Sequence, residues 1–375
     1  PLLFNLYIND IGSYLQDNGP GNISIQGTRI NHFLYADDLV LLSETKAGLQ
    51  RHLEGLENFS KAKELTVNTK KSVIMVFNSA GRKSNEKFTY NNKELKTVQS
   101  FTYLGVEIAA SGSFTVGIKN LCTKAKKAMI PLFRTIIQFR LPFRNALKLF
   151  LTFVEPILLY NAENWASMTD QEIKKCKNNH SRIYQKSTLA LPSVSQLKFL
   201  KFILGVTKQC PTMAVLGETA QLPLMLKGYL RMLTYWDRLR DLDDNSLVKM
   251  AYLENVAMNT NWCQTIQVLN CSQGLHNNLP NPPNTKFKTV AKKRIKDNFE
   301  NFWRNRIDNR EEEKKLAIYS QVKNEFKLDD YLQLPHFRDR QRISKFITSS
   351  HYLEVEKGRH HGKPREERTC QACDQ

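Results

Sequence analysis

Two adjacent carboxylates, Asp37 and Asp38, interrupt an otherwise apolar run in the segment NHFLYADDLVLLS, residues 31–43. Like charges placed beside a core are costly unless a cation compensates them. Mg²⁺ is a suitable cation because it prefers carboxylate oxygens and completes its coordination with substrate phosphates. Two such ions could activate a 3′-hydroxyl and stabilise departing pyrophosphate. The alternative is a turn in which the Asp side chains hydrogen-bond to neighbouring backbone.

The segments around this pair predict the elements that would position it. Apolar residues at 30–35 and 39–43 predict two strands that meet at Ala36, Asp37 and Asp38, so the carboxylates should lie at the tip of a β-hairpin. Helical spacing predicts helices over 1–15 and 45–63. Further strands are expected at 72–78 and 101–108, and a hairpin over 88–98 in which Asn91 and Asn92 supply a positive-φ turn.

Beyond residue 112 the pattern becomes helical. A stripe of apolar residues predicts a helix over 114–137 whose polar face carries lysines, and residues 145–166 predict a buried helix kinked near Pro156. A further helix is expected around residues 226–236, and another over 286–307. The predicted fold class is an α+β region of antiparallel hairpins with helices, followed by a mainly α-helical region.

Composition limits the kind of partner and compartment. The formal net charge of +19 indicates a polyanionic partner, most often nucleic acid, against the alternative of a basic protein with no such partner. The seven scattered cysteines do not form a disulfide framework, which predicts an intracellular protein that is not secreted. No stretch of 18 or more apolar residues is present. Because the chain opens at Pro1 inside an apolar segment, we expect it to be a fragment of a longer protein.

Four motifs, in order, resemble those of reverse transcriptases. YADD at 35–38 resembles the metal-binding hairpin, and PLLFNLYINDI at 1–11 looks like the end of the segment that leads into a palm helix. LTVNTKKS at 65–72 is similar to the following motif, and FTYLGVEI at 101–108 to the primer-grip hairpin. The particular residues resemble those of LINE-type retrotransposons, which lack long terminal repeats. The likeness continues through EPILLYNAENW at 155–165, where Asn161 stands at a position that is commonly Gly, and becomes looser beyond residue 170.

The resemblance implies a role for each matched residue of the metal-binding hairpin and the motif after it. Asp37 would bind Mg²⁺ or Mn²⁺, and Asp38 would hold the turn and its charge. Tyr35 would lie near the primer terminus. Lys71, with Lys70 as the rival assignment, would protonate or neutralise pyrophosphate. The alternative for this lysine is a solvated side chain before a strand.

Two further roles follow from the same resemblance. Asn68 would order the turn that carries the lysines. The primer strand would be supported by Tyr103, Leu104 and Gly105, with Gly105 permitting close approach of the backbone. Ordinary strand packing is the structural alternative for these three residues.

Two basic segments are candidate nucleic-acid surfaces. The first, on the helix at the position of a thumb, consists of Lys119, Lys124, Lys126 and Lys127, and the second includes Lys292, Lys293 and Arg294. Each could instead be a solvated helix face. The aromatic residues Phe299, Phe302 and Trp303 that follow the second segment have the spacing of core residues rather than of a stacking surface.

A last pair, Cys370 and Cys373, has metal-ligand spacing. Zinc takes four ligands, so the pair would be a partial, zinc-knuckle-like site, with His360 and His361 as candidate substitutes for the missing ligands.

These features together predict a domain plan and a function. We expect a palm remnant at 1–110, thumb-like helices at 111–170, a helical region at 171–271, a linker at 272–284 and a basic helical region at 285–375. The expected function is that of a LINE-type RNA-directed DNA polymerase, with an RNA template, a DNA primer and deoxynucleoside triphosphates as partners, in the nucleus or cytoplasm. The alternatives are a degenerate nucleic-acid-binding relic and an intron-encoded maturase, which shares the Asp-Asp hairpin.

Polymerisation should require more than this chain supplies. A two-metal polymerase needs a further palm Asp and the fingers, which precede this segment in the order of the resembling family. The 375-residue chain should therefore incorporate no more nucleotide than an Asp37→Ala variant in a primer-extension assay on an RNA template. Incorporation well above that control would contradict the prediction.

Overall fold

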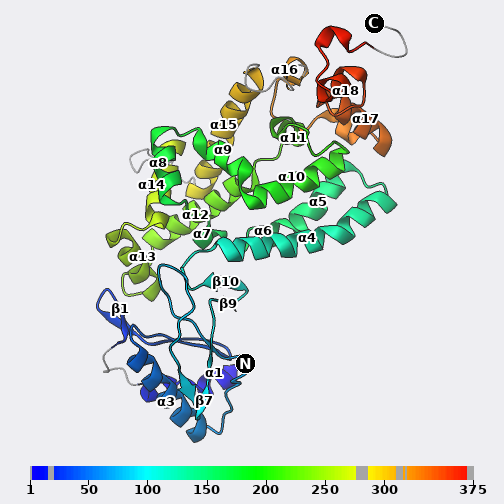
Figure 1. Cartoon of the computed structure of the whole chain (residues 1–375). Helices are drawn as coiled ribbons and strands as arrows, with labels where there is room; N and C mark the ends of the chain where they lie inside the picture. The colour runs from blue at the N-terminus through cyan, green and yellow to red at the C-terminus, as the bar shows by residue number, and fades with distance from the viewer. Residues whose placement is uncertain (1, 16–20, 276–285, 310–315, 317–318, 370–375) are drawn as a thin grey trace. The chain divides into compact units, whose positions relative to one another are not determined.

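The computed structural model describes residues 2–15, 21–275, 286–309, 316 and 319–369 (Figure 1). The chain forms two compact units. The first contains residues 1–117 together with 239–260, and the second contains residues 118–238 and 261–375. The predicted fold class is confirmed, since short hairpins occupy the N-terminal part and helices dominate from about residue 115 onward.

The first unit combines short strands with a few helices. Its elements are α1 (Leu2–Tyr7), α2 (Ile11–Tyr14), β1 (Ile23–Ile25), β2 (Thr28–Ile30), β3 (His32–Tyr35), β4 (Asp38–Leu41), α3 (Lys46–Ala62), β5 (Val73–Ile74), β6 (Thr89–Tyr90), β7 (Lys93–Glu94), β8 (Lys96–Thr97), β9 (Ser100–Tyr103), β10 (Val106–Ala109) and α13 (Leu247–Ala257).

Two-residue turns close the hairpins of this unit. β1–β2, β3–β4, β6–β7 and β9–β10 are antiparallel pairs. Asn91 and Asn92 have φ of 47° and 55°, so the predicted positive-φ turn is confirmed. One pairing differs from the expected hairpins: β5 pairs with β8 in parallel, because residues 75–95 supply the long connection that a parallel pair needs.

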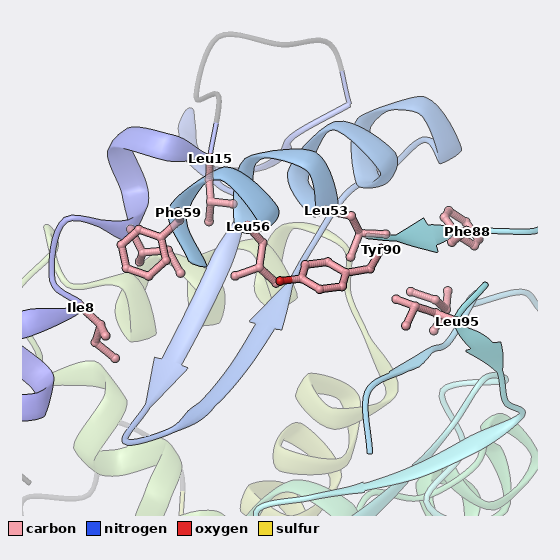
Figure 2. Packing of buried hydrophobic residues seen from close by; sticks show 10 residues of the cluster. Ile8, Leu15, Leu53, Leu56, Phe59, Phe88, Tyr90 and Leu95 are labelled. Carbon is pink, nitrogen blue, oxygen red and sulfur yellow. The ribbon is translucent and has the colours of Figure 1, made fainter. Parts of the chain in front are cut away.

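The core of the first unit gathers around α3 (Figure 2). Leu53, Leu56 and Phe59 project from the buried face of the helix, as the predicted amphipathic pattern requires. Gly55 lies where α3 approaches α2, and a Cβ there would come within 2.4 Å of the carbonyl oxygen of Tyr14. The close approach of the two helices therefore depends on this glycine. The predicted single helix over 1–15 is wrong in detail, since it breaks between α1 and α2.

The segment 239–260 belongs to this unit although it is distant in sequence. Gln26 Nε2 donates to Glu254 Oε2 at 2.7 Å, which joins the β1–β2 turn to α13. Lys249 is buried, and its Nζ donates to the carbonyl oxygens of Leu239 and Arg240 at 3.2 and 2.6 Å. Backbone carbonyls at the end of a helix thus compensate the buried charge.

The second unit is helical. Its elements are α4 (Thr115–Gln138), which begins in the first unit, α5 (Phe143–Phe153), α6 (Glu155–Leu158), α7 (Ala162–Trp165), α8 (Asp170–Asn178), α9 (Arg182–Leu189), α10 (Leu191–Leu204), α11 (Thr212–Thr219), α12 (Leu224–Arg240), which ends in the first unit, α14 (Asn261–Gln273), α15 (Phe287–Asp308), α16 (Tyr319–Val322), η2 (Asp330–Gln333), α17 (Phe337–Ile347), α18 (Glu354–His360) and η3 (Arg365–Glu367).

The expected linker at 272–284 lies mostly outside the described residues. Its first two positions belong to the end of α14, which runs to Gln273. Gly274 follows with φ of 64°, a conformation that ends a helix at low cost when the residue is glycine.

The expected kinked helix over 145–166 is wrong, because the structure divides it into α5, α6 and α7. Pro156 stands at the beginning of α6 rather than inside a continuous helix. Asn161 precedes α7 in the left-handed conformation, with φ of 56°. A backbone of this kind favours glycine, and asparagine is one of the few other residues that adopt it readily.

A buried polar network organises part of the second unit. Glu218 on α11 is fully buried and accepts a hydrogen bond from Tyr331 Oη at 2.5 Å. Lys323 Nζ lies 3.8 Å from Glu218 Oε1 and forms a closer ion pair with Asp329. Burial raises the pKa of Glu218 to about 7, and the carboxyl of Asp329 acts in the same direction, while Tyr331 and Lys323 oppose it.

This pKa makes the stability of the second unit depend on pH. Glutamate has an ordinary pKa of 4.5, so between pH 4.5 and about 7 the folded state keeps a proton that the unfolded state releases. This proton uptake stabilises the folded state by about 3 kcal/mol. The contribution is fully present below pH 4.5 and is lost as pH rises through about 7. In wild type the free energy of unfolding should therefore fall between pH 5 and 8, and in Glu218→Gln this fall should be absent.

Tryptophan fluorescence during denaturant unfolding measures this change selectively, because Trp165, Trp236, Trp262 and Trp303 all lie in the second unit. Glu86→Gln, at an exposed position of the first unit, is the matched control and should leave the profile unchanged. Equal pH profiles for wild type and Glu218→Gln would contradict the prediction.

Candidate active site

The hairpin β3–β4 places the two carboxylates at and beside its turn. Tyr35 is paired with Asp38, which leaves Ala36 and Asp37 as the two-residue loop. Ala36 has φ of 54°, a conformation that costs a non-glycine residue about 1–2 kcal/mol. Positive φ at the first loop position reverses the chain with the twist that a hairpin needs. Asp37 therefore lies in the turn, and Asp38 is the first residue of β4.

The two faces of this hairpin have different surroundings. Leu34 and Leu39 are directly opposite each other and pack against the core around α3. Because side chains alternate along a strand, Tyr35 and Asp38 share the other face. Tyr35 is 62% exposed, and Phe33, on the same face, is 40% exposed. Phe33 was not among the site residues predicted from the sequence. It could have been found there, because residues two positions apart on a strand share a face and Phe33 is two positions from Tyr35.

Both carboxylates are exposed at the hairpin tip. The apolar side chains Leu34 and Leu39 pack inward while both Asp residues are outside the core, so no cation is needed to compensate a buried charge. What favours a metal is instead the presence of two neighbouring, accessible carboxylates on a supported turn. Among the described residues, no group of three or more His, Cys, Asp or Glu side chains is arranged to hold a metal ion.

A residue of the second hairpin, β9–β10, interacts electrostatically with a carboxylate of the first. Leu104 and Gly105 form its turn, with φ of 47° and 81°. The reason for glycine at 105 is therefore this backbone conformation. Partial burial raises the pKa of Tyr103, and the negative charge of Asp38 raises it further. The structure thus brings Tyr103 within electrostatic reach of Asp38, two residues that are far apart in sequence.

A third segment, residues 68–72, is ordered by Asn68, as the sequence predicts. Its side-chain Oδ1 accepts from the backbone N–H of Lys70 at 3.2 Å and of Lys71 at 3.3 Å, and its carbonyl accepts from the backbone N–H of Ser72 at 3.0 Å. The side chains of Lys70 and Lys71 are both exposed in this turn. The geometry of the turn does not distinguish between them.

The predicted basic surfaces lie on exposed faces of helices. On α4, Leu121, Cys122, Ala125 and Met129 are buried, whereas Lys119, Lys124, Lys126 and Lys127 are exposed, so the predicted division of this helix into two faces is confirmed. On α15, Ala291, Ile295 and Phe299 are buried while Lys292, Lys293 and Arg294 are exposed. Phe299 and Trp303 are core residues, as their spacing predicts.

The predicted zinc ligands Cys370 and Cys373 lie outside the described residues, as does the side chain of His360. His361 is exposed, and its Nδ1 is 2.8 Å from the carbonyl oxygen of Lys357. Five cysteines fall within the described part of the chain, and none of these five is in a disulfide: Cys122, Cys176, Cys210, Cys263 and Cys271. No helix in this part is both long and apolar enough to cross a bilayer.

Comparison with known proteins finds one similarity, which lies in the N-terminal part. Residues 1–108 match the family model described as reverse transcriptase (RNA-dependent DNA polymerase). The matched range contains all four motifs on which the resemblance depends, and it ends at the last residue of FTYLGVEI. Residues 1–108 are thus similar to part of a reverse transcriptase domain. No curated protein matches the chain.

The proximity of the two hairpins generates a prediction. Replacing Asp38 by Asn removes the negative charge that opposes ionisation of the Tyr103 phenol, so the pKa of Tyr103 should fall. The measurement is an NMR titration of ¹³Cζ-labelled tyrosine. Asp243→Asn, which removes an exposed carboxylate elsewhere in the same unit, should leave the Tyr103 titration unchanged. An unchanged Tyr103 titration in Asp38→Asn would show that the hairpins do not meet.

Proposed function

We propose that this chain is part of a LINE-type RNA-directed DNA polymerase and that Asp37 and Asp38 hold divalent cations beside the 3′ end of a DNA primer. The observation that carries the proposal is the exposed pair of carboxylates on a two-residue turn, within the range that matches the reverse transcriptase family. Deoxynucleoside triphosphates and an RNA template would be the remaining substrates.

The turn fits Mg²⁺ better than an ion that needs many protein ligands. Mg²⁺ is commonly bound by one or two carboxylates while waters and substrate phosphates complete an octahedral shell. Asp37 in the turn and Asp38 at the start of β4 are both accessible for such binding. When bound, the ions would lower the pKa of the primer hydroxyl and neutralise charge on the departing pyrophosphate. Mn²⁺ has the same preference for oxygen ligands.

The other residues of the site would position the nucleic acid. Tyr35 shares a face with Asp38, so its exposed ring could contact the last base or sugar of the primer. Tyr103 lies within electrostatic reach of Asp38, which supports a role for the β9–β10 turn in holding the primer strand. The ammonium group of Lys71, or of Lys70, would neutralise or protonate pyrophosphate as it leaves.

The helical unit would hold the duplex by its phosphates. Lys119, Lys124, Lys126 and Lys127 occupy the exposed face of α4, and their charges would interact with the backbone independently of sequence. The exposed basic residues of α15 would add to this contact. Free thiols at the five described cysteines support a reducing compartment, hence the nucleus or cytoplasm.

A nucleic-acid-binding protein without catalysis is the second candidate. The exposed basic faces of α4 and α15 favour it, because they would bind phosphates whether or not the carboxylates hold metal. The reading frame upstream in the genome separates the two candidates. An open frame that encodes a further palm aspartate supports the polymerase, and stop codons or frameshifts support the binding protein. Flanking long terminal repeats would contradict the LINE-type assignment.

The metal site can be tested without measuring polymerisation. Fe²⁺ can replace Mg²⁺ at carboxylate sites, and with ascorbate and peroxide it cleaves nearby backbone. We expect cleavage around residues 35–38, with loss of this fragment pattern in Asp37→Asn. The matched control is Asp243→Asn with Asp244→Asn, an adjacent, exposed acidic pair in the same unit that is not on a hairpin turn. Cleavage that survives in Asp37→Asn would refute metal binding at this turn.

A further inference from the structure

Helix α17 is held in the second unit through one face. Arg340 is buried and donates to the carbonyl oxygens of Leu334 at 2.6 Å and Leu141 at 2.9 Å. Ser344, also buried, lies with its Oγ 3.0 Å from Tyr331 Oη. The side chain of Gln341 packs so closely on Gly205 that a Cβ there would approach its Cδ to 2.4 Å. These contacts fix which side of the helix faces outward.

The outward side carries a stripe of two cations and one aromatic ring. Arg338, Arg342 and Phe346 follow at intervals of four residues, so they lie along one face of the helix. All three are exposed, and Phe346 is 55% exposed. The helix contains four basic residues, Arg338, Arg340, Arg342 and Lys345, and a single acidic residue, Asp339. The Asp339 Oδ1 atom lies 3.4 Å from a guanidinium nitrogen of Arg342. The outer face of the helix therefore has an excess of positive charge.

Aromatic groups gather where this stripe ends. The ring of His351 stacks on Phe346, with centroids 5.6 Å apart and planes inclined by 30°. Tyr352 follows immediately and is 70% exposed. Exposed rings lose contact with water when a planar partner covers them, and two such rings near cations suit a partner that is both planar and negatively charged.

We propose that the outer face of α17, with residues 351 and 352, binds single-stranded nucleic acid. Arg338 and Arg342 would contact successive phosphates, while unpaired bases stack on Phe346 and Tyr352. A duplex keeps its bases stacked on each other, so it can use the cations but not the rings. Neither contact depends on the 2′-hydroxyl, so RNA and DNA single strands should bind alike. The site lies in the second unit and does not depend on metal binding by Asp37 and Asp38.

The test compares single-stranded and duplex affinity in the 375-residue chain. Fluorescence anisotropy would follow labelled oligothymidylate, oligouridylate and a DNA duplex of equal length. Phe346→Ala should weaken binding of both single strands about fivefold or more and leave the duplex affinity unchanged. Other basic surfaces of the chain also bind phosphates, so the difference between single strand and duplex is the informative quantity.

Two further variants separate stacking from charge. Phe77→Ala is the matched control, because Phe77 is 59% exposed but lies in the first unit, and it should leave all three affinities unchanged. Arg342→Gln should reduce the slope of log affinity against log salt by about 0.7 for single strands, the value for one phosphate contact. Phe346→Ala should leave that slope unchanged.

Several results would overturn the proposal. An equal loss of single-strand and duplex affinity in Phe346→Ala, or no loss in either Phe346→Ala or Tyr352→Ala, excludes base stacking. Binding to phosphatidylserine vesicles that requires Phe346, with unchanged oligonucleotide affinity, would assign the surface to membranes instead. Because the readout is binding alone, these results do not depend on the outcome of the metal test at Asp37.

Discussion

The candidate active site depends on a chain reversal that uses only two residues, Ala36 and Asp37. A two-residue loop sets the register of β3 against β4, and that register places Tyr35 opposite Asp38. Shifting the pairing by one residue would turn Leu34 and Leu39 away from the core and turn Tyr35 and Asp38 toward it. The positive φ of Ala36 is the local strain that this reversal requires.

The core around α3 holds this reversal in place. Leu34 and Leu39 pack against a cluster that includes Leu56 and Phe59. Tyr35 and Asp38, on the other face of the hairpin, are exposed. The carboxylates themselves contribute no burial, so their substitution should alter chemistry more than stability.

Glu218, in the second unit, is the opposite case. It is a fully buried carboxylate whose neighbours Lys323, Asp329 and Tyr331 belong to segments that follow α11 by a hundred residues or more.

Three helices of the second unit also have one face that packs inward and one that is exposed and basic. On α4, α15 and α17, contacts with the rest of the unit occupy one face and exposed cations occupy the other, while Arg340 on α17 is a cation of the packed face. Only on α17 among these three does the outer stripe end at a ring stacked on another aromatic residue, beside the exposed Tyr352. This combination distinguishes a surface suited to unpaired bases from one that attracts phosphates alone.

Features that depend on neighbouring residues could be predicted from the chain alone, and those that depend on distant contacts could not. Apolar segments on both sides of Asp37 and Asp38 predicted the hairpin, and helical periodicity separated the buried from the exposed residues of α4 and α15, because both patterns are local. The four ordered motifs likewise indicated the reverse transcriptase family. Tertiary packing, by contrast, paired β5 with β8 in parallel and brought Tyr103 within electrostatic reach of Asp38. It also joined residues 239–260 to the first unit and buried Glu218 among groups more than a hundred residues away. Such contacts are set by the packing of whole elements, which propensity and spacing along a chain do not encode.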